Sequence, residues 1–385
     1  MGLRVATVRA QRAARGDQRH QGSAEEILRA GLEACWTGEL LTASPGTYRH
    51  FWTRDLGFAA PALMRLGGPW PDRLRSSLAW AIGAWRRRGG HVTTTIDPVF
   101  RHPVDVFDYG VDSLPWLVSS LRAAGAVDLA REHAAWLAAE VEHYVERVVD
   151  PATGLVRADR HLSAHRDTFR NASTAYGNTM VALLARDIAE TGWGPDLLSH
   201  RFRRDGSDDG PPDWSRLLRR HFWLGDRFRD RLGSAATSGE ANVWPFHAGL
   251  VDDPPMLIAA LGTLRREGYA APYPLKFEVG HRTDGQLWAF RFWSPDYQTT
   301  TSWTSLGSIY LSLLRQVDPE AARLELGRMR ELIERDGAFW EVLDGRGRPW
   351  RSASRLSVSD ASMLWGAILL DLLEADADAA DRQAG

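Results

Sequence analysis

The feature that most limits the fold of this chain is a series of amphipathic stretches running through almost its whole length. Apolar residues recur in these stretches at three- and four-residue spacing, the pattern of a helix with one buried face. The stretches cover residues 24–35, 72–87, 111–123, 129–148, 174–190, 214–221, 255–267, 301–315, 319–335 and 359–375. Alternating or β-branched pieces at 91–96 and 155–158 are too few to organise a sheet, and we interpret them as small ribbons in loops. The sequence therefore predicts an all-α fold.

The number of helices and their connections narrow the architecture further. About a dozen helices in roughly 360 residues, joined by alternately short and long connections, suit a ring of helical hairpins better than a four-helix bundle. We expect an (α/α)6 toroid, which has six helical hairpins. Because the inner helices of such a ring meet at one end, functional residues should lie at inner-helix starts and in the long loops there.

The predicted domain organisation is one toroid domain over residues 23–376, with a flexible segment at 1–22 and a flexible tail at 377–385. A polar stretch rich in Pro and Gly at 203–213 predicts a linker or surface insertion. Helical periodicity resumes directly after this stretch, which favours a single domain.

Charge and cysteine content exclude several classes of protein. The formal net charge is −2, and arginines and carboxylates are interspersed, so no basic surface indicates nucleic-acid binding. No run approaches the roughly 20 apolar residues of a membrane span, and the first residues lack the apolar core of a secretion signal. Cys35 is the single cysteine, which suits a reducing compartment. We expect a cytoplasmic protein with a neutral ligand.

Aromatic residues are in excess, and several gather beside charged groups. The chain has 17 tryptophans, whose flat faces suit sugar rings as well as helix packing. In segment 48–58, Trp52 precedes Arg54 and Asp55. A guanidinium beside a carboxylate suits vicinal sugar hydroxyls, each of which both donates and accepts hydrogen bonds. The alternative is a helix cap with an ordinary ion pair.

The segment Phe51-Trp52-Thr53-Arg54-Asp55 resembles the aromatic-Trp-x-Arg-Asp signature of (α/α)6 six-hairpin glycosidases. Versions of this signature are shared by glucoamylases, trehalases, neutral/alkaline invertases and the glucosidase part of glycogen debranching enzymes. The resemblance implies that Arg54 and Asp55 bind the sugar in the minus-one subsite and do not donate the proton.

Two further segments match this group of enzymes in the expected order. Segment 108–116 resembles one that opens an inner helix in debranching-like enzymes, which implies that Asp112, with Tyr109 nearby, faces the substrate. The alternative is that Asp112 caps that helix. Segment 163–171 precedes Tyr176 and Asn178, and the resemblance implies a general acid and substrate contacts there.

We assign the general acid to Asp167, although the alignment with invertases and trehalases allows Asp159 instead. The reaction needs a carboxylic acid that is still protonated near neutral pH, so burial or a neighbouring carboxylate must raise its pKa. Arg166 and Arg170 flank Asp167 in the sequence. The alternative for this segment is a surface ladder of alternating Arg and Asp.

The general base is assigned to Glu341. Its segment, 339–347, resembles the one that carries the catalytic Glu of invertases and trehalases, and it lies between aromatic residues and a Gly-containing turn. Glu240, which precedes Trp244, is the alternative base. Two segments are expected to form pocket walls and to contact the substrate: 238–247, which contains Trp244, and 294–298, which precedes Trp303. The histidines show no metal-ligand spacing, so we expect no metal or other cofactor.

The leading hypothesis is an inverting glycoside hydrolase that acts on an α-glucosidic or related bond of a disaccharide or oligosaccharide. Inversion requires the two carboxyl groups to be about 6.5–9.5 Å apart, with a water between. One alternative is a noncatalytic carbohydrate-binding toroid. A terpenoid-cyclase-like toroid ranks last, because the chain lacks an Asp-rich metal motif close to an apolar stretch.

Overall fold

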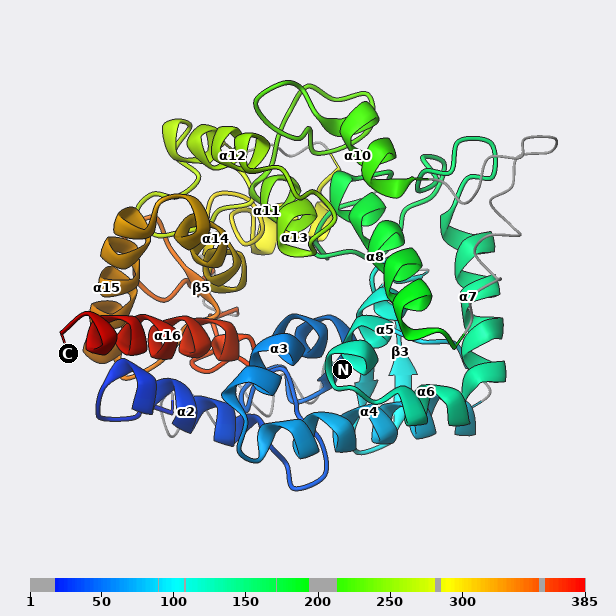
Figure 1. The fold of residues 1–385 in the computed structure, drawn as a ribbon, viewed down its shortest axis with the longest axis horizontal. Helices are drawn as coiled ribbons and strands as arrows, with labels where there is room; N and C mark the ends of the chain where they lie inside the picture. The colour runs from blue at the N-terminus through cyan, green and yellow to red at the C-terminus, as the bar shows by residue number, and fades with distance from the viewer. Residues whose placement is uncertain are drawn as a thin grey trace.

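The inner layer of the fold is a closed ring of helices (Figure 1). The computed structural model describes residues 18–88, 90–106, 109–170, 172–193, 213–280, 285–352 and 357–384. Neighbouring inner helices pack against each other in chain order, and the last packs against the first. They are α3 (Thr53–Leu66), α5 (Ser113–Ala123), α8 (Ala175–Thr191), α11 (Gly239–His247), α14 (Thr304–Val317) and α16 (Gly366–Ala384). The predicted (α/α)6 toroid is confirmed.

An outer layer of helices surrounds this ring. It consists of α2 (Ala24–Cys35), α4 (Trp70–Arg87), α6 (Val127–Glu132), α7 (Ala134–Val148), α10 (Trp214–Phe222), α12 (Pro254–Arg266) and α15 (Pro319–Asp336). Helix α2 packs against α15 and α16, so the first helix completes the last part of the ring. The single helix expected over 129–148 is wrong, because the chain leaves helical geometry at His133, with φ −112° and ψ 16°, between α6 and α7.

Local sequence signals explain where many helices begin. Ser23 forms a capping box with Glu26 at the start of α2. Thr174 caps α8, Ser238 caps α11, and Asp318 caps α15. Periodicity did not predict α11, because nearly every residue of this short helix is buried and no polar stripe exists.

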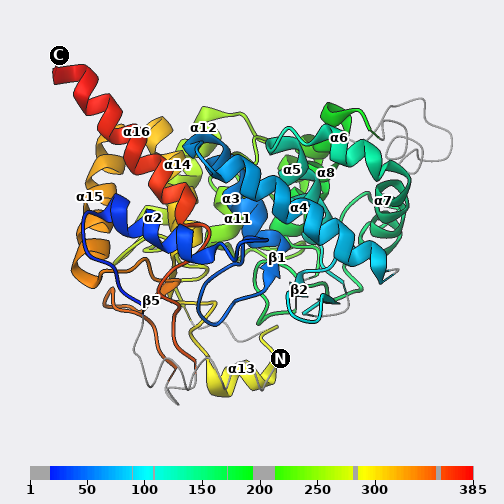
Figure 2. The same cartoon turned by 90° about the horizontal axis from the view of Figure 1, so that it is seen from below.

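Two small antiparallel sheets lie at one end of the ring, where Figure 2 also shows α13 (Trp288–Trp293). Strand β2 (Thr95–Asp97) pairs with β1 (Phe51–Trp52) on one side and with β3 (His102–Val104) on the other. Strand β4 (Ser302–Trp303) pairs with β5 (Val342–Leu343). Strands β1 and β4 lead directly into inner helices α3 and α14. The piece expected at 155–158 forms only an isolated bridge, between Val149 and Val156.

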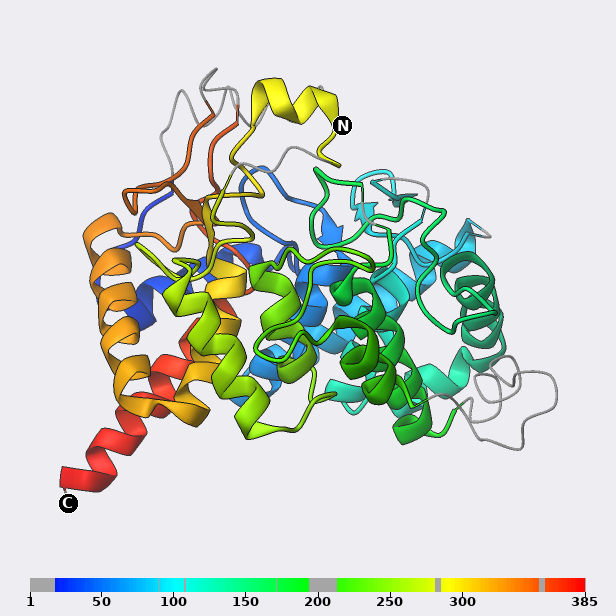
Figure 3. The same ribbon diagram turned by 90° about the horizontal axis from the view of Figure 1, so that it is seen from above.

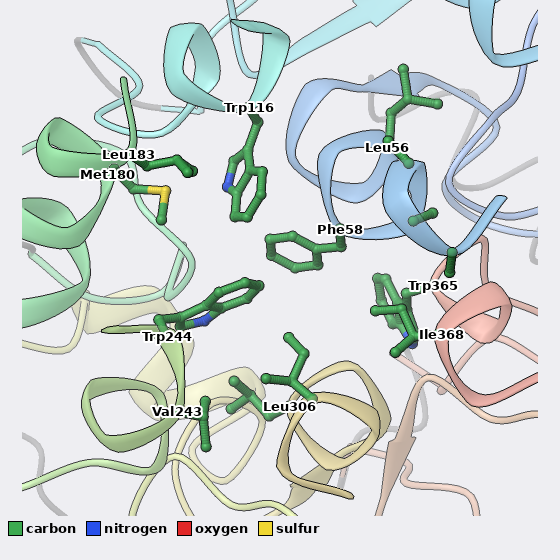
Figure 4. Close-up of a cluster of buried hydrophobic side chains, with 14 of the residues drawn as sticks. Leu56, Phe58, Trp116, Met180, Leu183, Val243, Trp244, Leu306, Trp365 and Ile368 are labelled. Carbon is green, nitrogen blue, oxygen red and sulfur yellow. The ribbon is translucent and has the colours of Figure 1, made fainter. Parts of the chain in front are cut away.

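Side chains from all six inner helices or their first residues fill the axis of the ring (Figure 4). The labelled ones are Leu56, Phe58, Trp116, Met180, Leu183, Val243, Trp244, Leu306, Trp365 and Ile368. Helices α3 and α5 approach closely because residue 57 is a glycine: a Cβ atom there would lie 2.6 Å from the Trp116 side chain. Phe58 and Trp365 also line the pocket above this core, so the packed axis forms part of the pocket floor.

The structure describes only parts of the two ends expected to be flexible and of the polar stretch 203–213. Residues 1–17 lie outside it, whereas the backbone N–H of His20 donates to the Gly337 carbonyl at 2.8 Å. Of the polar stretch 203–213 only Asp213 is described, and it caps α10. Helix α16 continues to Ala384, into the expected tail 377–385. Among the described helices, none combines the length and the apolar character needed to cross a membrane.

Candidate active site

A pocket opens at the end of the ring that carries the sheets and α13, the upper end in Figure 3. The empty space within the pocket and in its open mouth is about 780 Å³. Aromatic side chains make up much of its wall, with a smaller set of polar and charged groups between them. The lining residues are Tyr48, Trp52, Arg54, Asp55, Phe58, Val106, His165, Asp167, Thr168, Phe290, Tyr297, Gln298, Trp303, Glu341, Met363 and Trp365.

Arg54 and Asp55 reach the pocket because β1 ends at Trp52 and the chain turns at once into inner helix α3. Both side chains lie in the first turn of that helix and are buried. Among the described residues, no other side chain hydrogen-bonds to the Asp55 carboxylate. Burial raises the pKa of Asp55 to about 7, against the opposing effect of Arg54. Asp55 therefore remains available to accept a hydrogen bond from a ligand.

The Arg54 guanidinium pairs with two other carboxylates instead of its neighbour Asp55. Its Nε donates to Asp112 at 2.6 Å, and its Nη1 donates to Asp167 at 3.1 Å. Most of the guanidinium N–H groups that we expected to bind sugar hydroxyls therefore already donate to these two carboxylates. Arg54 connects the starts of α3 and α5 with the loop that carries Asp167.

Asp112 lies at the N-cap position of α5, but its side chain does not cap the helix. It is fully buried and accepts from Arg54 and from the Tyr176 hydroxyl, the latter at 2.8 Å. The Trp116 indole N–H in turn donates to the Tyr176 hydroxyl at 3.1 Å. Contrary to our expectation, Asp112 and Tyr176 do not line the pocket, because both lie behind Arg54.

Asp167 lies in the loop before α8, with its side chain 23% exposed and facing the pocket. Ser163 Oγ donates to it at 3.3 Å. Burial raises the pKa of the Asp167 carboxyl above its ordinary value, although the Arg54 guanidinium acts in the opposite direction. Asp159, the alternative acid, pairs with Arg157 on the exposed side of the loop and does not line the pocket.

The loop around Asp167 is fixed by Gln298. The Gln298 side-chain carbonyl accepts from the backbone N–H and the hydroxyl of Thr168, both at 2.8 Å, and its amide donates to the His165 carbonyl at 3.1 Å. Arg166 turns away from the pocket and is buried against Asp230 and Glu278. The segment is therefore not a surface ladder of alternating Arg and Asp.

Glu341 faces the same pocket from the residue before β5, and it is 2% exposed. The Tyr297 hydroxyl donates to one carboxylate oxygen, and the backbone N–H of Asp360 donates to the other at 3.2 Å. Burial and the neighbouring Asp360 carboxylate raise the pKa of Glu341 to about 8, although both hydrogen bonds favour the ionised form.

Tyr48, Tyr297 and Asp360 complete the surroundings of Glu341. Tyr48 and Tyr297 lie in segments expected at the pocket, but none of the three residues had been given a role of its own. The Tyr48 and Tyr297 hydroxyls are 2.8 Å apart. Asp360 accepts from Ser44 Oγ at 2.5 Å and from the backbone N–H of Thr47 at 2.7 Å, which ties the segment before β1 to the chain beside Glu341. These contacts join residues about 250 to 320 positions apart, so no local sequence pattern signals them.

The remaining predicted residues divide into two groups. Trp303 lines the pocket, and its indole N–H donates to the Tyr297 carbonyl at 2.6 Å. Tyr109 stacks on His91 with ring centroids 5.2 Å apart, away from the pocket wall. Asn178 accepts from the Val156 backbone N–H at 2.9 Å and donates to Thr174 at 2.8 Å, so it holds the start of α8. Tyr109 and Asn178 were expected to contact the substrate, but neither residue lines this pocket.

Glu240 and Trp244 lie in α11, behind the pocket wall. Trp244 is fully buried in the ring axis, and Glu240 is 2% exposed. Burial raises the pKa of Glu240 to about 8, against the opposing effect of Arg166. Contrary to our expectation, neither residue lines the pocket, so Glu240 does not share it with Asp167. Within the described chain, no three His, Cys, Asp or Glu side chains gather as a metal site requires.

Solved structures with the same architecture cover nearly the whole chain. A wild-type glycosidase matches 91% of this chain and 94% of its own, with a TM-score of 0.63 at 17% identity. A Klebsiella oxytoca rhamnosidase with rhamnose bound matches 91% of this chain and 62% of its own, with a TM-score of 0.64 at 16% identity. The GH63 mannosylglycerate hydrolase of Thermus thermophilus, in complex with Tris and D-glycerate, matches 91% of this chain and 100% of its own, with a TM-score of 0.58 at 14% identity.

These similarities establish that the chain is built like six-hairpin glycosidases over 91% of its length. A glycosidase variant in complex with glucose belongs to the same set of similar structures. No model of a known protein family matches the sequence, and no curated protein matches it.

Proposed function

We propose that the protein is an inverting glycoside hydrolase that cleaves an α-glucosidic or related bond in a neutral disaccharide or oligosaccharide. The observation that carries this proposal is that two carboxylates from distant parts of the chain, Asp167 and Glu341, line one aromatic pocket. The fold shared with glycosidases and the sugars bound in two similar structures support a carbohydrate substrate.

In the proposed reaction, Asp167 protonates the glycosidic oxygen while Glu341 removes a proton from the attacking water. The C–O bond to the leaving group breaks as the bond from water to the anomeric carbon forms on the opposite face of the sugar. The leaving alcohol keeps the proton from Asp167, and Glu341 keeps the proton from water. Asp55 accepts a hydrogen bond from a hydroxyl of the bound sugar, and Arg54 orients Asp167.

The charge of the pocket favours a neutral substrate. Among the described lining residues, Asp55, Asp167 and Glu341 are acidic, and Arg54 is already paired with carboxylates. An anionic sugar would meet these acids without a free cation to balance its charge. A sugar with neutral hydroxyls can instead use the carboxylates as acceptors and the aromatic rings as apolar faces.

The first experiment screens α-glucosides, sucrose, trehalose and malto-oligosaccharides for released reducing sugar. The wild-type protein should hydrolyse at least one of them, and Asp167→Asn and Glu341→Gln should each lower kcat by about 10²-fold or more. Glu140→Gln is the matched control, because Glu140 is a buried carboxylate that accepts from the Val92 backbone N–H outside the pocket. Sugar binding without turnover would instead support a noncatalytic carbohydrate-binding protein.

A second substrate, α-glucosyl fluoride, tests which of the two carboxylates is the acid and which is the base. Fluoride leaves α-glucosyl fluoride without needing a proton from a general acid, whereas the attack of water still needs a base. Asp167→Asn should therefore retain far more activity on the fluoride than on an oligosaccharide. Glu341→Gln should lose activity on both substrates. The opposite pattern would exchange the roles of acid and base.

A further inference from the structure

One polar group in the pocket wall has no part in the proposed reaction: the imidazole of His165. This side chain lines the pocket two residues before Asp167 and is 3% exposed. Its ring packs edge to face against Phe58 and Phe277, with centroids 5.2 Å and 5.1 Å apart. Packing on two sides and a backbone fixed by Gln298 leave the ring little freedom to turn.

The Nδ1 atom of His165 faces two groups behind the pocket. The Trp244 indole Nε1–H donates to Nδ1 at 3.4 Å. An indole N–H is a donor only, so Nδ1 must present its lone pair. Glu240 Oε2 also lies 3.4 Å from Nδ1. Because burial raises the pKa of Glu240 to about 8, its carboxyl group is mostly protonated near neutral pH, so no carboxylate there favours a proton on Nδ1.

The ring is also neutral. Burial lowers the pKa of His165 to about 3, and the nearby Arg54 guanidinium acts in the same direction. A neutral imidazole carries one proton, so with Nδ1 as acceptor the proton resides on Nε2. No described residue hydrogen-bonds to Nε2, and this atom is not enclosed by protein. A donor therefore remains available at the pocket wall.

We propose that His165 donates its Nε2–H to one hydroxyl oxygen of the sugar beside Asp167, and that Trp244 holds the ring in the required tautomer. The proposal rests on the proposed function, since it specifies how the same pocket recognises its substrate. Trp244 is then a positioning residue behind the donor. This role explains why a buried indole N–H points at the ring nitrogen on the far side from the pocket.

The substrate side of the proposal is tested with His165→Phe and a set of monodeoxy glucosides. In the wild-type enzyme, loss of the contacted hydroxyl should lower kcat/KM by about tenfold, the size expected for one hydrogen bond between neutral groups. In His165→Phe, kcat/KM for the parent glucoside should fall by the same factor. For the glucoside that lacks the contacted hydroxyl, His165→Phe should lower kcat/KM no further. If His165→Phe lowered kcat/KM by a similar factor for the parent and for every deoxy glucoside, the proposal would be overturned.

Two further variants separate binding from folding. His165→Gln keeps an amide donor near the position of Nε2 and should recover part of the loss. His247→Phe is the control, because His247 contacts the Trp244 ring but does not line the pocket. Its kcat/KM should match that of the wild type. If His165→Gln folds and recovers no activity, a donor at this position is not what the substrate needs.

The tautomer is tested without substrate by ¹⁵N NMR of the protein labelled at histidine. The His165 signals should show an unprotonated Nδ1 and a protonated Nε2 from pH 6 to 7.5, and Trp244→Phe should change the Nδ1 signal. A proton on Nδ1 in the wild type would overturn the proposal whatever the enzyme hydrolyses. The expected tautomer in a protein that cleaves no glucoside would instead show that the proposed function has failed.

Discussion

Removing the hydroxyl of Tyr297 tests which groups set the pKa of Glu341. Tyr297→Phe removes the hydrogen bond to the Glu341 carboxylate but keeps the ring, which packs on Trp303 and Trp350 with centroids 4.9 Å away in each case. A hydrogen bond to a charged group contributes about 1.5–3 kcal/mol, which corresponds to about 1–2 pKa units. Since this bond favours the ionised form, its loss should raise the pKa of Glu341 from about 8 to roughly 9–10.

This shift has a defined kinetic consequence. At pH 7 about a tenth of Glu341 is ionised in the wild type, and the variant should retain roughly a tenth to a hundredth of that amount. We therefore expect kcat/KM at pH 7 to fall about 10- to 100-fold. The limb of the pH profile that lies near pH 8 in the wild type should move to higher pH by the same one to two units.

The assay is the pH dependence of kcat/KM from pH 5 to 10.5, with Tyr310→Phe as the control. Tyr310 is a buried tyrosine of α14 that does not line the pocket, so its variant should reproduce the wild-type profile. A Tyr297→Phe profile with the limb still near pH 8 would refute the reasoning, whatever the loss of activity, because the hydroxyl would then not set the pKa of Glu341.

Three further predictions concern stability. Gln298→Leu leaves the buried Thr168 groups without their acceptor, so the free energy of unfolding in urea should fall by about 1–3 kcal/mol. Gly57→Ala places a Cβ atom 2.6 Å from Trp116 and should cost about 1–3 kcal/mol, measured by calorimetry. The folded-state pKa of Glu240, about 8, lies above its ordinary value of 4.5, so its stabilising contribution is complete below pH 4.5 and is lost as the pH rises through 8. Glu240→Gln does not titrate, so its Tm relative to that of the wild type should increase between pH 5 and pH 9; an unchanged difference would contradict the shifted pKa.

Much of the fold could be predicted because a helix with one buried face leaves a periodic pattern. That pattern located outer helices such as α2 and α15. It failed for α11, whose residues are almost all buried, and for α13, which has only six residues. A helix without a polar stripe, or with fewer than two turns, has too little periodicity to be recognised.

The pocket could be predicted only in part. Ordered short motifs pointed to Asp55, Asp167 and Glu341, and the structure brings all three to one pocket. The partners of these groups depend on which elements the ring places side by side. Arg54 pairs with Asp112 because α3 packs against α5, and this pairing is not visible in the order of residues.

Burial also changed the interpretation of several motif residues. The sequence resemblance implied that Asn178 contacts the substrate, but its amide donates to the backbone carbonyl of Thr174, four residues earlier. Amide side chains near helix starts commonly satisfy local backbone groups in this way. Conversely, His165 gave no signal in the sequence, because only the contact from Trp244 indicates its tautomer.

In the proposed reaction, Asp167 and Glu341 act together in one pocket to hydrolyse an α-glucosidic bond with inversion. The most direct measurement is a proton NMR time course of the hydrolysis, which identifies the anomer of the sugar before it equilibrates in water. With inversion, β-glucose should be the first product from an α-glucoside. Initial release of α-glucose would contradict it, because retention requires a covalent intermediate on one of the carboxylates.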